Sequence, residues 1–206
     1  MSVTFADALD RYELYARAIS YSRAQIRLTR FAVGLLARFL EPTTDIQEMT
    51  RDDFLRFLAD LQIRPARKSS GKESGHPLSK TTVNTYARNI KAFFVWLSNE
   101  GIITENPTAK VPAPRLPTTV PKVYSEDDLI KVSKTVTGLR DRAIYELFLD
   151  SGMRLQELSK LDIKDVNTKK GFAIAKGKGG KERPVYFTQP VSESLEAYLK
   201  DFRSEA

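Results

Sequence analysis

Two cationic positions in the C-terminal half of the chain could do chemistry together: Arg154, which follows Gly152-Met153, and a lysine within 176–183. Arginine presents a planar fork of N–H donors that matches phosphate oxygens, whereas lysine carries a compact ammonium group that can also give up a proton. Together they suit a substrate that carries a phosphate. Taken singly, each has a simpler interpretation, because surface arginines are commonly salt-bridged and Gly/Lys-rich segments commonly form soluble turns.

The elements expected to position these side chains are a helix junction and a β-hairpin. Gly152 is the residue type that accepts the left-handed conformation past a helix end, and a short amphipathic helix is predicted to follow it. Its inward residues are expected to be Leu155, Leu158 and Leu161. Two β-prone runs, 172–176 and 183–187, enclose six residues rich in glycine and lysine. This pattern predicts a hairpin with lysines at its tip.

The combined pattern is more specific than either part. The runs Gly152-Met-Arg-Leu-x-Glu-Leu158, Leu161-x-x-x-Asp165-Val166 and Gly177-Lys-Gly-x-Lys-Glu-Arg183 follow one another in that order. They resemble the first arginine box and the following hairpin of the tyrosine recombinases, also called phage integrases, which include the Xer-type chromosome recombinases. The resemblance extends over most of residues 80–200.

The resemblance assigns roles to individual residues of the box and the hairpin. It implies that Arg154 clamps the scissile DNA phosphate, that Lys178 protonates the leaving 5′ oxygen, and that Glu157 supports the active-site arginines. Lys176 and Lys181 flank Lys178, so the choice of catalytic lysine depends on the motif register.

The later boxes of the family have no counterpart here. These are a His-x-x-Arg motif, a further His or Trp, and the tyrosine nucleophile. His76 is the single histidine and is expected in a solvated loop, while Tyr198 falls on the apolar stripe of a final helix and is expected to pack. We therefore expect about the first two thirds of such an enzyme, with no nucleophile in this chain and no activity from these residues alone.

Two functions are compatible with this interpretation. The first is site-specific DNA recombination or integration, in which the full-length protein cleaves and rejoins DNA through a 3′-phosphotyrosyl intermediate. The family resemblance implies double-stranded DNA as partner, assembly of a tetramer on DNA, and no cofactor or metal. The second is a naturally shortened, non-catalytic DNA-binding regulator of recombination. The target site, and the choice between integration, resolution and transposition, stay open.

The first half of the chain carries two polar, mostly basic stripes at helical spacing. Amphipathic patterns predict helices over 4–19, 22–40, 54–61 and 79–99. The stripes comprise Arg23, Arg27 and Arg30 on the second helix and Lys80, Asn84, Arg88 and Lys91 on the fourth. They could grip DNA phosphates, or they could be ordinary solvated faces. The resemblance favours DNA, with Asn84 and Arg88 expected to reach base edges.

The predicted fold class is mainly α with a small β-hairpin or sheet. By resemblance, residues 1–106 form a SAM-like four-helix core-binding domain and residues 122–206 form the N-terminal part of a catalytic domain. Residues 107–121 contain five of the ten prolines, so an extended interdomain linker is expected. Helices are also predicted from Ser125 to about 135 and over 139–150. Predicted buried positions include Phe31, Leu35, Phe39, Ala143, Ile144, Leu147 and Phe148.

Composition sets broad limits on function. The net charge of +7 favours a polyanionic partner such as nucleic acid, and the absence of cysteine excludes disulfides and thiolate metal sites within these residues. The sequence shows neither a signal-like leader nor a long apolar run. A cytoplasmic protein is therefore expected.

Overall fold

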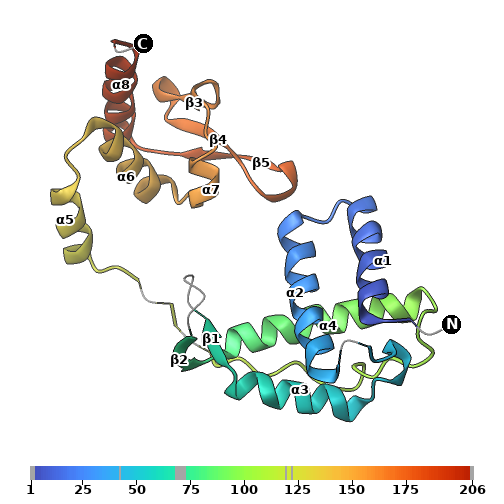
Figure 1. The fold of residues 1–206 in the computed structure, drawn as a ribbon. Coiled ribbons are helices and arrows are strands. Elements are labelled where there is room, and N and C mark those ends of the chain that lie inside the picture. The colour runs from blue at the N-terminus through green and yellow to red at the C-terminus, as the bar shows by residue number, and fades with distance from the viewer. Residues whose placement is uncertain (1–2, 42, 68–72, 119, 122, 205–206) are drawn as a thin grey trace. The chain divides into compact units, whose positions relative to one another are not determined.

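A computed structural model describes residues 3–41, 43–67, 73–118, 120–121 and 123–204, except for the side chains of residues 67, 178 and 202–204. The described part is mainly helical with two small antiparallel sheets, which confirms the predicted fold class (Figure 1). The chain divides into two compact units, Met1–Thr119 and Val120–Ala206. Among the described helices, none has the length and apolarity needed to span a membrane.

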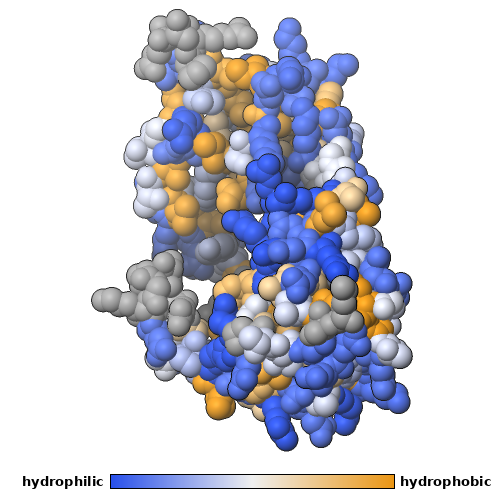
Figure 2. Space-filling model, turned by 45° about the vertical axis from the view of Figure 1, so that its right-hand side comes forward, coloured by the Kyte–Doolittle hydropathy of each residue, from blue (hydrophilic) through white to orange (hydrophobic). Residues whose placement is uncertain are grey.

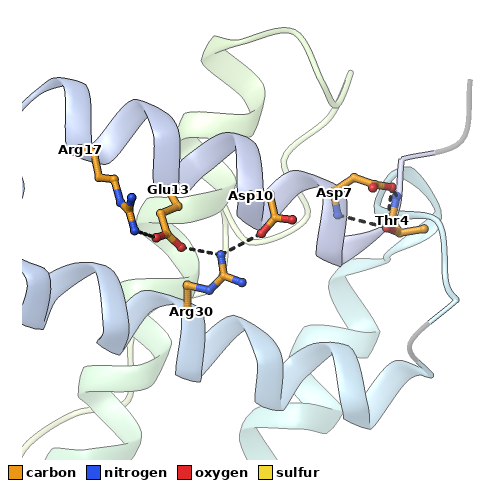
Figure 3. Close-up of polar contacts among 6 residues, drawn as sticks. All are labelled: Thr4, Asp7, Asp10, Glu13, Arg17 and Arg30. Atoms are coloured by element: carbon orange, nitrogen blue, oxygen red, sulfur yellow. Dashed lines mark hydrogen bonds and ion pairs between the residues drawn. The ribbon is translucent and has the colours of Figure 1, made fainter.

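Unit 1 contains α1–α4, and local sequence signals set where its helices begin. Thr4 and Thr50 each accept a hydrogen bond from the backbone N–H three residues on, while Asp7 and Asp53 bond back to the threonine N–H groups. Figure 3 shows the first of these capping boxes. The elements are α1 (Phe5–Ala18), α2 (Arg23–Leu40), the 3-10 turn η1 (Ile46–Glu48), α3 (Arg51–Ile63) and α4 (Lys80–Asn99).

α4 supplies much of the core of unit 1, because it packs against α1, α2 and α3. Phe93 and Phe94 on α4 are fully buried and meet edge to face, with ring centroids 5.8 Å apart. Phe5, Phe54 and Phe57 are also fully buried. Burying one such side chain contributes about 1.5–3 kcal/mol, so this aromatic core holds the four helices together.

The core face of α2 differs from the predicted one. Phe31 is 51% exposed and lies against Tyr86, with ring centroids 5.6 Å apart, while Leu35 and Phe39 are partly buried. The buried stripe consists of Ile26, Thr29, Ala32, Val33 and Leu36. α2 packs against α1, α3 and α4, and the aromatic residues Phe31 and Phe39 are not part of its buried stripe. The prediction for Phe31 was therefore wrong.

Two short strands follow α3 in the described part of the chain. Strands β1 (Pro65–Arg67) and β2 (Glu73–Pro77) pair antiparallel, with Pro65 opposite Pro77. His76 lies on β2, exposed to solvent, so its predicted solvation is confirmed although its loop assignment is wrong. Short runs that contain proline and glycine give a weak strand signal, which explains why the sequence did not predict this hairpin.

Unit 2 is built around a three-stranded sheet with α6 and α8 packed together beside it. Strand β4 is central, and Ala175 on β4 lies opposite Arg183 on β5. The elements are α5 (Glu126–Thr135), α6 (Leu139–Ser151), α7 (Leu155–Leu158), η2 (Ile163–Asp165), β3 (Val166–Asn167), η3 (Thr168–Lys170), β4 (Phe172–Lys176), η4 (Lys178–Gly180), β5 (Glu182–Tyr186) and α8 (Gln189–Ser204). The predicted hairpin is present, with its second strand beginning one residue early.

The burial predictions for unit 2 hold in part. Ala143 and Leu147 are buried, and Tyr198 packs against the core as predicted. Ile144 and Phe148 are 39% and 40% exposed, so their predicted burial was wrong. Figure 2 shows hydrophobic residues (orange) interspersed with hydrophilic ones (blue) on the face in view.

The inward placement of Leu155 was also wrong. This side chain is 70% exposed, because α7 is a single turn and Leu155 is its first residue. Leu158 and Leu161 do pack against the core of unit 2.

Candidate functional site

Arg154 lies at the junction of α6 and α7, where the chain changes direction sharply. Gly152 ends α6 with φ 59°, a left-handed conformation that glycine adopts without a steric penalty. Two residues later Arg154 is the N-cap of α7, and its side chain is 76% exposed. The junction therefore holds the backbone of Arg154 in place while its guanidinium group stays accessible.

Glu157 connects this arginine to the hairpin. Its carboxylate is 3% exposed and accepts hydrogen bonds from the Arg154 backbone N–H (3.0 Å) and from Arg154 Nη1 (2.8 Å). It also accepts one from Arg183 Nη2, at 3.0 Å. The bonds from Arg154, followed by the one from Arg183, lower the pKa of Glu157 to about 2. The carboxylate is therefore ionised near neutral pH and is held by two arginines.

The hairpin loop approaches the same carboxylate closely. A Cβ atom added at Gly177 would lie 3.4 Å from Glu157 Oε1, and the Gly177 N–H donates to the Lys181 carbonyl at 2.8 Å. Lys178 follows at once in the chain and begins η4, but its side chain lies outside the described residues. Gly177, the residue before Lys178, therefore lies beside the Glu157 carboxylate, and the catalytic role of Lys178 stays a prediction.

The two flanking lysines differ in their surroundings. Lys176 Nζ lies 2.6 Å from Asp165 Oδ2, and this bond raises the pKa of the lysine. Lys181 is exposed. Because Lys176 forms an ion pair with Asp165, its geometry favours a structural role. The choice of Lys178 as the catalytic lysine rests on the motif register and remains a prediction.

Sequence reasoning missed part of this cluster. It indicated Arg183 only as the first residue of a strand and Asp165 only as part of a motif, whereas the structure brings both side chains to the site. No local signal could have identified these contacts, because each joins residues well separated in the chain. The alternation of β5, which points Arg183 and Val185 to one face of the strand, was the available hint.

The predicted basic stripe on α2 contains both exposed arginines and an ion-paired one. Arg23 and Arg27 are exposed, whereas Arg30 Nη1 lies 2.9 Å from Asp10 Oδ1 and 2.6 Å from Glu13 Oε2 on α1. Figure 3 shows these ion pairs, together with the contact between Glu13 and Arg17. Arg30 therefore helps to hold α2 against α1, and its guanidinium group already has acidic partners.

The predicted stripe on α4 is divided in the same way. Lys80 and Arg88 are exposed. Lys91 Nζ donates to the carbonyls of Thr108 (2.6 Å), Ala109 (3.4 Å) and Val111, and Asn84 Nδ2 donates to the Pro114 carbonyl at 2.6 Å. Burial lowers the pKa of Lys91. These two side chains fasten the proline-rich segment to α4.

Residues 124–206 match the family model described as the phage integrase family. The tyrosine recombinase XerA of Pyrococcus horikoshii is 30% identical over 196 residues, which are 95% of this chain and 61% of that protein. XerC of Thermodesulfovibrio yellowstonii is 38% identical over 126 residues, 59% of this chain and 42% of that one. The chain belongs to the tyrosine recombinase family.

The fold is shared with the same family. A lambda integrase tetramer bound to a Holliday junction superimposes with a TM-score of 0.71 at 17% identity, covering 95% of this chain and 56% of that one. The present chain spans about half the length of the curated recombinases that it matches, between 42% and 61% in the two named above.

Proposed function

We propose that the chain forms the DNA-gripping and phosphate-clamping part of a site-specific recombinase that cleaves and rejoins DNA. The observation that carries the proposal is the cluster around Glu157. A buried carboxylate orients an exposed arginine at a helix junction and lies directly beneath a lysine-bearing hairpin loop. This arrangement suits a phosphodiester, which needs charge neutralisation on its non-bridging oxygens and a proton for its leaving oxygen.

Each residue of the cluster has a proposed part in the reaction. One Nη of Arg154 is bonded to Glu157, and the exposed remainder of the guanidinium group is proposed to bind the scissile phosphate. In the cleavage step a tyrosine oxygen, whose proton would pass to a base outside these residues, forms a bond to phosphorus while the bond to the 5′ oxygen breaks. Lys178 is proposed to give its proton to that leaving oxygen. The tyrosine would come from a part of the enzyme that lies outside these residues.

The remaining residues are proposed to hold the duplex. Residues 1–106 would act as the core-binding domain, residues 107–121 as the linker, and residues 122–206 as part of the catalytic domain. Direct phosphate contacts are proposed for the exposed cations Arg23, Arg27, Lys80 and Arg88. Arg30, Asn84 and Lys91 are proposed to contribute by holding neighbouring segments in place. Assembly into a tetramer on DNA is proposed by analogy with the lambda integrase complex.

The first test is the reading frame of the gene downstream of codon 206. An in-frame His-x-x-Arg motif followed by a tyrosine would support the recombinase. A stop codon would instead support the alternative proposal, a non-catalytic DNA-binding regulator, because this chain would then supply no nucleophile.

The role of Arg154 is tested with the product of the complete gene. Arg154→Ala is expected to lower covalent protein–DNA complex formation on a nicked substrate by at least about 100-fold, since an oriented charge is lost from the transition state. DNA affinity should change by less than about threefold, because one contact among many is removed. Arg142→Ala, which removes an exposed arginine of α6, is the control. Loss of folding or of all DNA binding in Arg154→Ala would contradict the proposed role.

A further inference from the structure

Arg183 lies at the point where the hairpin meets the arginine box. It is the second residue of β5 and faces Ala175 on β4, so it stands directly beside the loop that contains Lys178. Its Nη2 atom donates to Glu157 Oε2 at 3.0 Å, across a sequence separation of 26 residues. This contact joins two elements that each carry one of the proposed catalytic cations.

The two oxygens of the Glu157 carboxylate accept hydrogen bonds from different sets of donors. Oε2 accepts from both the Arg154 backbone N–H and Arg183 Nη2, whereas Oε1 accepts from Arg154 Nη1 and faces Gly177. A buried carboxylate bonded on both oxygens cannot rotate without breaking a charge-assisted hydrogen bond. Removing the Arg183 donor would leave Oε2 with the Arg154 backbone N–H as its one donor, so the orientation of the carboxylate would be held less firmly.

We propose that Arg183 is a positioning residue for the reaction. It fixes the rotation of Glu157, which in turn aims the Arg154 guanidinium group, and it ties the loop 177–181 to the arginine box. One side chain thereby sets the distance between the phosphate clamp and the proton donor. This inference rests on the proposed recombinase function for its chemical meaning, although the coupling itself is a property of the folded chain.

Because Arg183 is partly exposed, the experiment must distinguish positioning from a second role, direct contact with DNA. Its side chain is 46% exposed, so a direct DNA contact is the alternative to positioning. A direct contact would affect DNA binding and leave Arg154 undisturbed in the free protein. Positioning would disturb Arg154 before any DNA is present.

The test is NMR spectroscopy of the 206-residue chain without DNA. The variants are Arg183→Met, Arg183→Lys and the control Arg142→Met, which removes an exposed arginine paired with Glu146 on α6. In Arg183→Met we expect the Arg154 side-chain Nε–H signal to shift and the pKa of Glu157, followed through its carboxyl carbon, to rise. We also expect hydrogen exchange of the Gly177 amide to accelerate about tenfold, as loss of one charge-assisted bond implies.

The other variants decide the interpretation. Arg183→Lys should restore most of all three readouts because it keeps a charged donor, and Arg142→Met should change none of them. If the Arg154 signal and the Glu157 pKa stay at their wild-type values in Arg183→Met, the positioning role is wrong. Should Arg183→Met fail to fold, wild-type signals in a folded Arg183→Lys would support the role, and disturbed signals would contradict it.

A separate measurement with DNA keeps the two proposals apart. Mobility shifts of the same variants on duplex DNA test the recombinase function. If Arg183→Met disturbs Arg154 and Glu157 as expected but the chain binds no DNA, the proposed recombinase function is wrong and the positioning role of Arg183 stands. If the chain binds DNA but Arg183→Met leaves Arg154 and Glu157 unchanged, only the positioning role of Arg183 is wrong.

Discussion

Glu157 is a buried acid whose charge the surrounding structure requires. Two arginines and a backbone N–H donate to this carboxylate, whose side chain is 3% exposed. Burying a charge without such partners is costly, so the two arginines and the acid form a unit in which each depends on the others.

This dependence predicts how stability varies with pH. The pKa of Glu157 is about 2 in the folded chain and 4.5 ordinarily, so its ionisation stabilises the fold at pH values above 4.5. That contribution is lost as the pH falls from 4.5 towards 2. We expect Glu157→Gln to have a lower melting temperature than the wild type at pH 7. This difference in melting temperature should shrink progressively as the pH falls from 4.5 towards 2. Thermal melts followed by circular dichroism at several pH values measure both effects.

The control for this prediction is Glu196→Gln, which neutralises an exposed carboxylate on α8. It should leave the melting temperature and its pH dependence nearly unchanged. Equal melting curves for Glu157→Gln and wild type at pH 7 would show that the carboxylate does not bind its two arginines in solution.

At the scale of elements, the proline-rich segment is partly fastened to α4. Residues 107–118 form neither helix nor strand, so their backbone groups need other partners. Lys91 supplies them for Thr108, Ala109 and Val111, and both Thr108 and Val111 are buried. The first part of the predicted linker is therefore held against α4 within unit 1.

Lys91→Met tests this role. It keeps much of the side-chain length but removes the ammonium donor. The Val111 carbonyl then loses that partner and the Thr108 carbonyl keeps the Val111 N–H alone, at a cost of about 1–3 kcal/mol. We expect a lower urea midpoint and faster proteolysis within residues 107–114. Lys80→Met, an exposed lysine at the start of the same helix, is the matched control and should change neither. Unchanged cleavage of the segment in Lys91→Met would rule out the proposed fastening.

The elements also show what sequence could and could not predict. The capping boxes at Thr50 and Ser125 each arise from four adjacent residues, and the left-handed conformation predicted for Gly152 is confirmed. The core face of α2 and the exposure of Leu155 depend on which neighbours arrive from elsewhere in the chain. The Glu157–Arg183 bond depends on the strand register, which local patterns do not specify.

At the scale of the whole molecule, each unit has its own hydrophobic core, and the cations of the chain fall into two groups. Some, such as Arg30 and Lys91, are bonded to acidic or carbonyl oxygens within unit 1, while others, such as Arg88, are exposed. The net charge of +7 counts both groups equally. Only the exposed group is free to replace the counterions that surround DNA, so the charge total overstates the DNA-binding surface.

A pair of substitutions separates the two groups. Arg88→Ala is expected to weaken binding of the 206-residue chain to duplex DNA and to reduce the slope of log K against log salt by about 0.9, the value for one lost phosphate contact. Arg30→Ala removes the same charge, but this arginine is bonded to Asp10 and Glu13. It should lower the melting temperature and leave the slope close to wild type.

Mobility-shift titrations between about 50 and 200 mM salt give both slopes. An unchanged slope in Arg88→Ala would remove that residue from the DNA contacts, and a reduced slope in Arg30→Ala would mean that DNA displaces its acidic partners.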